Sequence, residues 1–197
     1  MRYYVWVFIV LITAGFAVAQ QPSAAEPTNS TAAPLAKNLP KPSPEMQRFS
    51  DMVLGRWRVE EAHGIRRGLP SGGTGSGMAI FRLGPGGLSV IEDYASKNPW
   101  GDFVEHGMIW WNPQIGAFQR IECETITTTG CKYSETPGKW EGNVVVFRSE
   151  HQQGDRKLKI VERYSQTSRD VFTVTMDAVA ETGETRRVMT VTHTRVQ

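Results

Sequence analysis

The four histidines, at positions 63, 106, 151 and 193, are the residues of this sequence best suited to acid–base or metal chemistry. They show neither the HxH nor the HExxH spacing that brings imidazoles onto one metal ion, so no metal site is predicted. His106 and His193 alternate with apolar residues along two predicted strands, which indicates that both point inward. We interpret them as histidines hydrogen-bonded inside a polar-lined fold; the alternative is a haem ligand, and no other cofactor is indicated.

Two short stretches place charged side chains at strand spacing. Glu92 and Tyr94 share one strand face, and Arg120 and Glu122 share another. Glu92 with Glu122 is the one carboxylate pair that could perform acid–base work. The favoured interpretation is that these faces are outer and solvated, or that they form an internal salt bridge such as Glu92 to Arg120, because a buried charge needs a partner. The sequence shows no Ser/His/Asp or Cys/His nucleophile arrangement. It therefore predicts no catalytic residue and no enzyme.

The glycine-rich stretch SGGTGSG, Ser71 to Gly77, contains the GxxxxG spacing of a phosphate-binding loop. Met78 and Ala79 follow it where that motif needs lysine and a hydroxyl residue, so nucleotide binding is not predicted. We expect a flexible loop that leads into a strand and lies where the mouth of a barrel could open.

The two cysteines, Cys123 and Cys131, are separated by ETITTTG. In an exported chain such a pair predicts a disulfide, which here would join two successive strands. The alternative, a metal pair, supplies only half of a tetrahedral site.

The first nineteen residues contain an arginine, an apolar run and a small-residue ending at Ala17–Ala19. This pattern predicts a secretory signal peptide over 1–19, cleaved between Ala19 and Gln20, and a protein exported to the periplasm or the extracellular space. The apolar run is about fourteen residues, shorter than the roughly twenty of a membrane-spanning helix; an uncleaved anchor is the alternative. Residues 20–44, rich in Pro, Ala, Ser and Thr, predict a disordered linker, and residues 45–197 a single domain.

The net charge of the chain and its distribution do not indicate binding to a polyanion such as nucleic acid. Removal of the signal peptide changes the formal net charge from +2 to about +1, and basic and acidic residues interleave along the chain. A nucleic-acid-binding surface needs charge of one sign. Nucleic acid is therefore not an expected partner, and stable membrane insertion is not expected once the signal is cleaved.

The domain consists of short runs of alternating polarity separated by Gly, Pro, Asn and Asp, which predicts an all-β fold. The connections have hairpin length, so the expected architecture is an antiparallel up-and-down barrel of about ten strands, closed or nearly closed. One short helix is expected over Pro44 to Met52, with Ser43 as its N-cap. The expected strands are 53–61, 77–83, 88–96, 103–111, 117–124, 132–134, 144–151, 158–165, 170–178 and 186–196.

The stretch VLGRWRVEE of the first expected strand and MTVTHTRVQ at the end of the chain resemble the two motifs that close lipocalin-like (calycin) barrels. The resemblance implies that Trp57 seals one end of the barrel and that Arg195 packs across its ring. The chain also resembles the secreted bacterial family called domain of unknown function 1579 over residues 46–196. The matching stretches are LGRW, MIWWNPQIGAFQRIEC, the GC that follows, GKWEG and MTVTHTR. That resemblance implies no catalytic residues.

A surplus of aromatic residues on the predicted inner faces favours binding of a small apolar or amphipathic ligand inside the barrel. The alternative is an envelope interaction module whose barrel is filled by side chains. An interior of several hundred Å³ would distinguish the binder from the module. The predicted pocket residues are Glu92, Tyr94, His106, Trp110, Phe118 and Arg120, with Trp111 and Phe147 as further aromatic candidates.

Overall fold

The structure is a computed structural model that describes residues 40–64, 72–125, 130–134, 136–153 and 156–197. Residues 38–197 form one compact unit, to which all that follows refers. The predicted signal peptide, its cleavage point at Ala19 and Gln20, and the linker up to residue 39 lie outside the described residues. Within the described part, no helix has the length and apolar character needed to cross a membrane.

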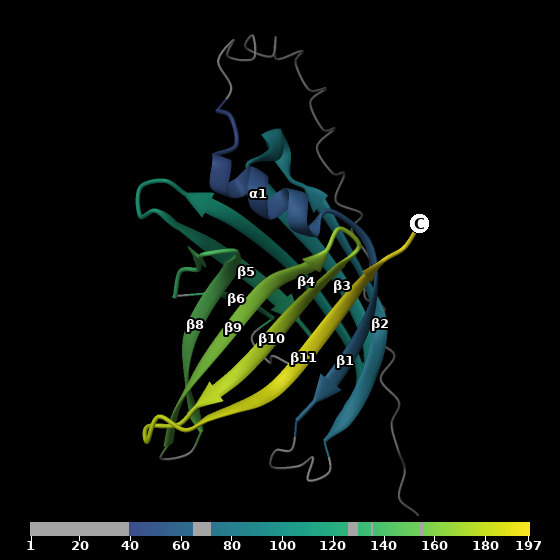
Figure 1. Ribbon diagram of the computed structural model, residues 1–197, viewed down its shortest axis with the longest axis vertical. Coiled ribbons are helices and arrows are strands. Elements are labelled where there is room, and N and C mark those ends of the chain that lie inside the picture. Colours follow the sequence, from purple (N-terminus) through teal and green to yellow (C-terminus); the bar gives the residue numbers. More distant parts are fainter. Residues whose placement is uncertain (1–39, 65–71, 126–129, 135, 154–155) are drawn as a thin grey trace, which may run out of the picture. The chain divides into compact units, whose positions relative to one another are not determined.

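One helix, one short 3-10 turn and eleven strands make up the unit (Figure 1). Helix α1 spans Pro44–Val53, and η1 spans Pro85–Gly87. The strands are β1 (Gly55–His63), β2 (Gly73–Leu83), β3 (Ser89–Asn98), β4 (Gly101–Asn112), β5 (Ala117–Glu124), β6 (Cys131–Tyr133), β7 (Lys139–Glu141), β8 (Val144–Gln153), β9 (Arg156–Ser168), β10 (Val171–Val179) and β11 (Thr185–Arg195).

The strands form one antiparallel sheet in which β1 pairs with both β2 and β11, and the edges are β6 and β7. The sheet curls into a half-barrel, as all-β chains with hairpin connections tend to do. Near α1, one antiparallel bridge between Phe118 and Gly138 connects β5 to the segment before β7, with N–O distances of 2.7 and 2.8 Å. The expected antiparallel lipocalin-like barrel is confirmed.

Helix α1 lies across one end of the barrel (Figure 1). The Oγ atom of Ser43 accepts a hydrogen bond from the Met46 backbone amide at 3.2 Å, as expected of an N-cap. The helix buries Phe49, whose ring centroid lies 5.2 Å from that of Phe118 on β5. Val53 was expected to start a strand, but it is the last residue of the helix. Its side chain is fully buried in the core below α1, and this burial favours the helical position.

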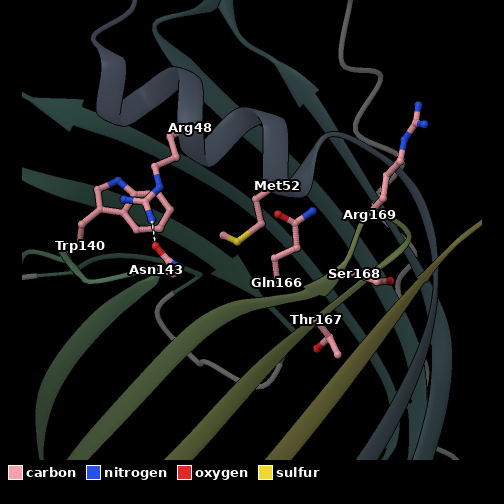
Figure 2. A pocket seen from close by; sticks show the side chains of 8 residues that line it. All are labelled: Arg48, Met52, Trp140, Asn143, Gln166, Thr167, Ser168 and Arg169. Carbon is pink, nitrogen blue, oxygen red and sulfur yellow. Dashed lines mark hydrogen bonds between the residues drawn. The ribbon is translucent and has the colours of Figure 1, made fainter.

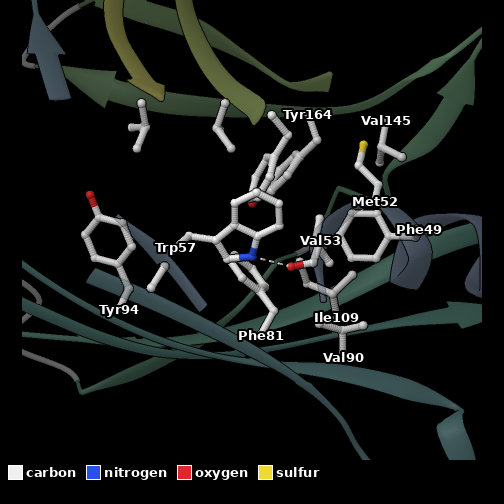
Figure 3. Close-up of a cluster of buried hydrophobic side chains, with 14 of the residues drawn as sticks. Phe49, Met52, Val53, Trp57, Phe81, Val90, Tyr94, Ile109, Val145 and Tyr164 are labelled. Atoms are coloured by element: carbon white, nitrogen blue, oxygen red, sulfur yellow. Dashed lines mark hydrogen bonds between the residues drawn. The ribbon is translucent and has the colours of Figure 1, made fainter. Parts of the chain in front are cut away.

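The inner face of the barrel divides into two halves. The capped half, next to α1, is filled by side chains that exclude solvent (Figure 3). Trp57 and Phe172 pack edge to face at 4.7 Å there, and both are 0% exposed. In the open half, farther from α1, Arg120 and Glu162 are buried, but several other inner-face side chains are only partly buried. These are Glu92, Phe103, Glu105, Glu122, Ile160, Met176 and Met189. Water therefore reaches part of the inner face in the open half.

The glycine-rich stretch is mainly strand, which corrects the expected loop. Strand β2 begins at Gly73, and only Ser71 of the stretch lies outside the described residues. A Cβ at Gly77 would lie 2.0 Å from the Ala95 carbonyl oxygen, and one at Gly75 would lie 2.6 Å from Glu61 Oε2. Gly75 and Gly77 are thus explained by crowding on the inner face of β2, whereas Gly72, just before the strand, has a φ of 70°.

Candidate functional site

A cluster of charged side chains lines the open half, and we call it the carboxylate cluster. Its centre is Arg120 on β5, which forms ion pairs with Glu162 on β9 at 2.7 Å and with Glu122 at 3.1 Å. The Arg120 guanidinium also lies over the Phe147 ring, 4.4 Å from its centroid. At the edge of the cluster, Lys132 on β6 pairs with Glu124 at 2.6 Å. The members of the cluster are Glu92, Glu105, Glu122, Glu124, Glu162, Arg120 and Lys132.

Two carboxyl groups of this cluster, Glu92 on β3 and Glu105 on β4, form no ion pair or hydrogen bond with the residues that the structure describes. Desolvation, followed by the nearby charges of Glu162 and Glu122, raises the pKa of Glu92 to about 8. Desolvation, followed by repulsion from Glu92, also raises the pKa of Glu105. Both groups therefore retain protons at a pH where an ordinary glutamate is ionised.

Tyr164 on β9 brings a hydroxyl to the same region. The residue is only 5% exposed, and its hydroxyl makes no hydrogen bond within the described part of the chain. Burial, then the charges of Glu162 and Glu92, raise its pKa, so the hydroxyl stays protonated.

A second polar group on the inner face joins Glu61, His63 and Tyr94. The Tyr94 hydroxyl donates to Glu61 Oε1 at 2.5 Å, and His63 Nε2 lies 2.6 Å from Glu61 Oε2. Because a carboxylate only accepts, the imidazole donates from Nε2. His63 also packs edge to face against Trp100 at 4.9 Å. Burial, then the bond to Glu61, raises the pKa of Tyr94.

His193 on β11 points inward, as the strand pattern predicts. Its ring is 2% exposed and stacks on Phe172 at 4.0 Å with an interplanar angle of 9°. Burial lowers its pKa to about 3, so the ring is neutral at physiological pH. The ring is enclosed by aromatic side chains of the core, which does not favour the haem-ligand alternative.

The six predicted pocket residues are divided between the two faces of the sheet. Glu92, Tyr94, Phe118 and Arg120 lie on the inner face, although Phe118 belongs to the filled capped half. Arg120 pairs with Glu162 and Glu122 rather than forming the expected bridge to Glu92. Of the further aromatic candidates, Trp111 packs against Phe118 at 5.0 Å, and Phe147 lies under Arg120.

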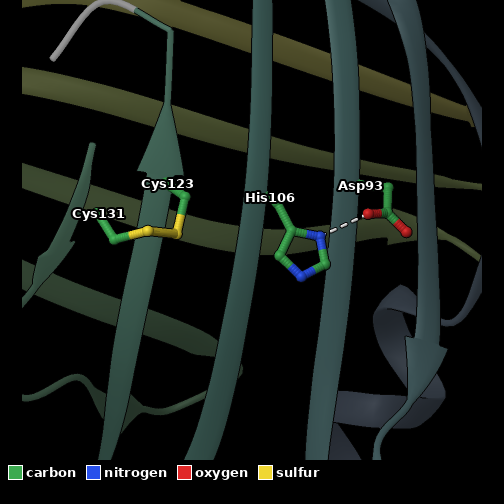
Figure 4. Close-up of a disulfide and its surroundings, with 4 residues drawn as sticks. All are labelled: Asp93, His106, Cys123 and Cys131. Atoms are coloured by element: carbon green, nitrogen blue, oxygen red, sulfur yellow. Dashed lines mark hydrogen bonds and ion pairs between the residues drawn. A yellow bond between two sulfur atoms is a disulfide. The ribbon is translucent and has the colours of Figure 1, made fainter. Parts of the chain in front are cut away.

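His106 and Trp110 lie on the outer face, so their predicted inward orientation is wrong. His106 Nδ1 lies 2.6 Å from Asp93 Oδ1 in an exposed pair (Figure 4), and this contact lowers the pKa of Asp93. Trp110 packs against Tyr133 at 6.1 Å. The prediction took apolar neighbours as the sign of an inner face, but here the inner face of β4 carries Glu105 and Gly107.

The cysteines are also on the outer face (Figure 4), where Cys123 and Cys131 are directly opposite in the β5–β6 ladder. They form a disulfide with an S–S distance of 2.03 Å.

The end-sealing contact implied by the lipocalin resemblance is present at the α1 end. The Arg195 guanidinium lies 4.1 Å from the Trp57 ring centroid, and the two residues face each other in the β1–β11 ladder. Trp57 Nε1 donates to the Val53 carbonyl at 2.7 Å, which fixes the ring under α1.

The surface holds a pocket of about 480 Å³ outside the barrel, beside α1 (Figure 2). Arg48 of α1 lies over the Trp140 ring at 3.8 Å and donates to Asn143 Oδ1 at 2.7 Å. The end of β9, residues 166–168, and Arg169 of the following turn form the other side. A second hollow of about 390 Å³ lies over β1, β2 and β11 near Glu60 and Thr192. Among the residues that the structure describes, no three His, Cys, Asp or Glu side chains are placed to hold a metal ion.

No protein-family model matches the sequence, and no curated protein matches it either. Solved structures are similar in fold. An S-type phycobiliprotein lyase from Guillardia theta aligns over 77% of this chain and 93% of its own, with a TM-score of 0.52 and 8% identity. Rv2717c from M. tuberculosis aligns over 80% of this chain and 100% of its own, with a TM-score of 0.51 and 12% identity. The protein thus has a lipocalin-like β-barrel fold, and at these identities the likeness concerns the fold alone.

Proposed function

We propose that this protein is an exported lipocalin-like barrel that binds a small amphipathic ligand in its open half. The observation that carries the proposal is the division of the inner face. The capped half forms the core, whereas the open half presents partly exposed apolar and charged side chains to solvent. A concave surface with apolar walls and a few polar groups is typical of ligand sites. The disulfide fits an oxidising compartment. We also propose membership of the domain of unknown function 1579 family, on the stretches quoted above.

Tryptophan fluorescence tests the binding. Trp100, 47% exposed, packs on His63 of the inner face and serves as the reporter. Micromolar addition of a ten-carbon amphiphile should change the emission saturably, and Trp100→Phe should remove most of the change. Native mass spectrometry of protein purified from its own host should show a bound small molecule. If no amphiphile changes the emission, and native mass spectrometry finds only the mass of the polypeptide, the results would instead support the interaction module.

A further inference from the structure

The space above Gly107 on β4 is flanked by two acids. A Cβ built on Gly107 would lie 3.6 Å from Glu105 Oε1 and 3.7 Å from Glu92 Cβ, at ordinary van der Waals contact. Gly107 pairs with Glu92 in the β3–β4 ladder, and Glu105 is two residues away on the same face. The glycine therefore leaves a niche one group wide on the inner face, bordered by the Glu105 carboxyl group, the Glu92 side chain and the Ile121 carbonyl oxygen at 3.7 Å.

The charges around this niche are unbalanced. The guanidinium of Arg120 is already shared between Glu162 and Glu122, and Lys132 is closest to Glu124. Within the described part of the chain, no cation is paired with Glu92 or Glu105. Burying a carboxylate without a counter-charge is costly, so a cation in the niche would stabilise both groups in their ionised form.

The Tyr164 hydroxyl, which forms no hydrogen bond with the residues that the structure describes, is a second, independent feature of this region that suits a ligand. It is held in a residue only 5% exposed and lies within electrostatic range of Glu92 and Glu162. A hydroxyl and two carboxylates are all acceptors, and a primary ammonium group carries three donors in need of acceptors. Met176 and Met189, cross-strand neighbours on the inner face of β10 and β11, are partly exposed apolar residues that could contact a hydrocarbon tail.

We propose that the open half binds a small amphipathic amine, with its ammonium group in the niche over Gly107 between Glu92 and Glu105. This inference rests on the proposed function and specifies the chemistry of its ligand.

The contribution of the head group to the affinity is measured with three ligands that share the same hydrocarbon tail: decylamine, decanol and decanoate. Each is titrated below its aggregation limit into the full mature chain. Decylamine should bind at least about tenfold more tightly than decanol, since a charged hydrogen-bonded contact contributes about 1.5–3 kcal/mol. Decanoate should bind most weakly, because it adds a like charge to the site.

Variants locate the head group. Gly107→Ala places a methyl group in the niche without a close contact, and Glu92→Gln or Glu105→Gln removes one charge. Each should reduce decylamine affinity about tenfold or more and leave decanol affinity nearly unchanged. Glu60→Gln is the matched control, since Glu60 is exposed on the outer face of β1. Circular dichroism confirms that each variant is folded.

The pH dependence gives a readout independent of mutation. Groups facing Glu92 are Glu105 from β4, Glu162 and Tyr164 from β9, and Glu122 and Arg120 from β5; the charge of Asp93, on the outer face of the same strand, also acts on it. Because the pKa of Glu92 is about 8, amine binding at neutral pH must release a proton. Decylamine affinity should therefore rise from pH 6 to pH 8, by at most about tenfold per unit for each proton released from Glu92 and Glu105, and then level off. Decanol affinity should not follow this rise.

The outcomes separate the two proposals. If decanol binds and decylamine binds no more tightly, the amine proposal is wrong and the binding function stands. If Glu60→Gln weakens decylamine as much as Glu92→Gln does, overall charge rather than the niche attracts the amine, and the proposed site is wrong. If none of the three compounds binds, the proposed function itself fails.

Discussion

Glu92 has a consequence for stability as well as for binding. Its pKa is raised from 4.5 to about 8 in the folded protein by desolvation and by neighbouring acids. The folded state therefore holds a proton that the unfolded state has lost. The stabilising contribution is fully present below pH 4.5 and is lost as the pH rises through about 8.

We predict that Glu92→Gln becomes more stable relative to the wild type as the pH rises from 5 to 8. The difference should change by on the order of 1–2 kcal/mol, after allowance for partial solvent access. Urea denaturation at the two pH values measures it. Asp93→Asn is the control: the pKa of Asp93 is lowered from 3.8, so this group is ionised in both states over the whole window. Parallel stability curves for Glu92→Gln and the wild type would contradict the shift.

Among the elements, β6 depends most on a covalent bond. It has three residues, all exposed, and pairs only with Ile121–Cys123 of β5. The disulfide between Cys123 and Cys131 closes a short loop and so restricts the unfolded chain.

Removing this bond with Cys123→Ala and Cys131→Ala together should lower the free energy of unfolding by about 2–3 kcal/mol in the chain-entropy model. Denaturation with and without dithiothreitol checks it: the reductant should destabilise the wild type and leave the double variant unchanged. Two free thiols in the unreduced, denatured wild type would show that the bond does not form.

Sequence periodicity predicted most elements, because strands such as β1 alternate strictly between exposed and buried residues. It missed β7, which has only three residues and no space for a pattern. It assigned β4 the wrong inner face because Met108 and Trp110 outside are more apolar than Glu105 and Gly107 inside. A charged interior inverts the rule on which the prediction depends.

The candidate site was predictable only in part for the same reason. Glu92 and Arg120 were found from alternation within single strands. Glu105 and Glu162 were missed because their charged neighbours come from strands that face each other across the barrel. Which strands face each other depends on how the sheet curls, and the sequence pattern of a single strand does not show it. Gly107 carries no signal in the sequence at all, since its role follows from the side chains beside it.

In the whole molecule, the capped half and the open half of the barrel have different roles. The capped half concentrates the fully buried aromatic residues, which stabilise the fold enough to tolerate unpaired acids in the open half. Arg195 connects three parts of the capped end. It donates to the Leu54 carbonyl at 2.8 Å, pairs with Asp170 at 3.3 Å and covers Trp57.

Gly55 explains why the first strand begins with Gly-x-Trp: it adopts a φ of 128°, and a Cβ there would lie 2.5 Å from Arg195 Nη1. We predict that Arg195→Met, which keeps the apolar stem but loses the cation–π contact and the hydrogen bond, lowers the free energy of unfolding by about 1–3 kcal/mol. Arg58→Met, an exposed change on the outer face of β1, should stay within about 0.5 kcal/mol of the wild type. Urea denaturation compares them. Because Arg195 lies at the capped end, decanol should bind both folded variants with wild-type affinity. Equal stabilities for the two variants would show that this contact does not hold the capped end together.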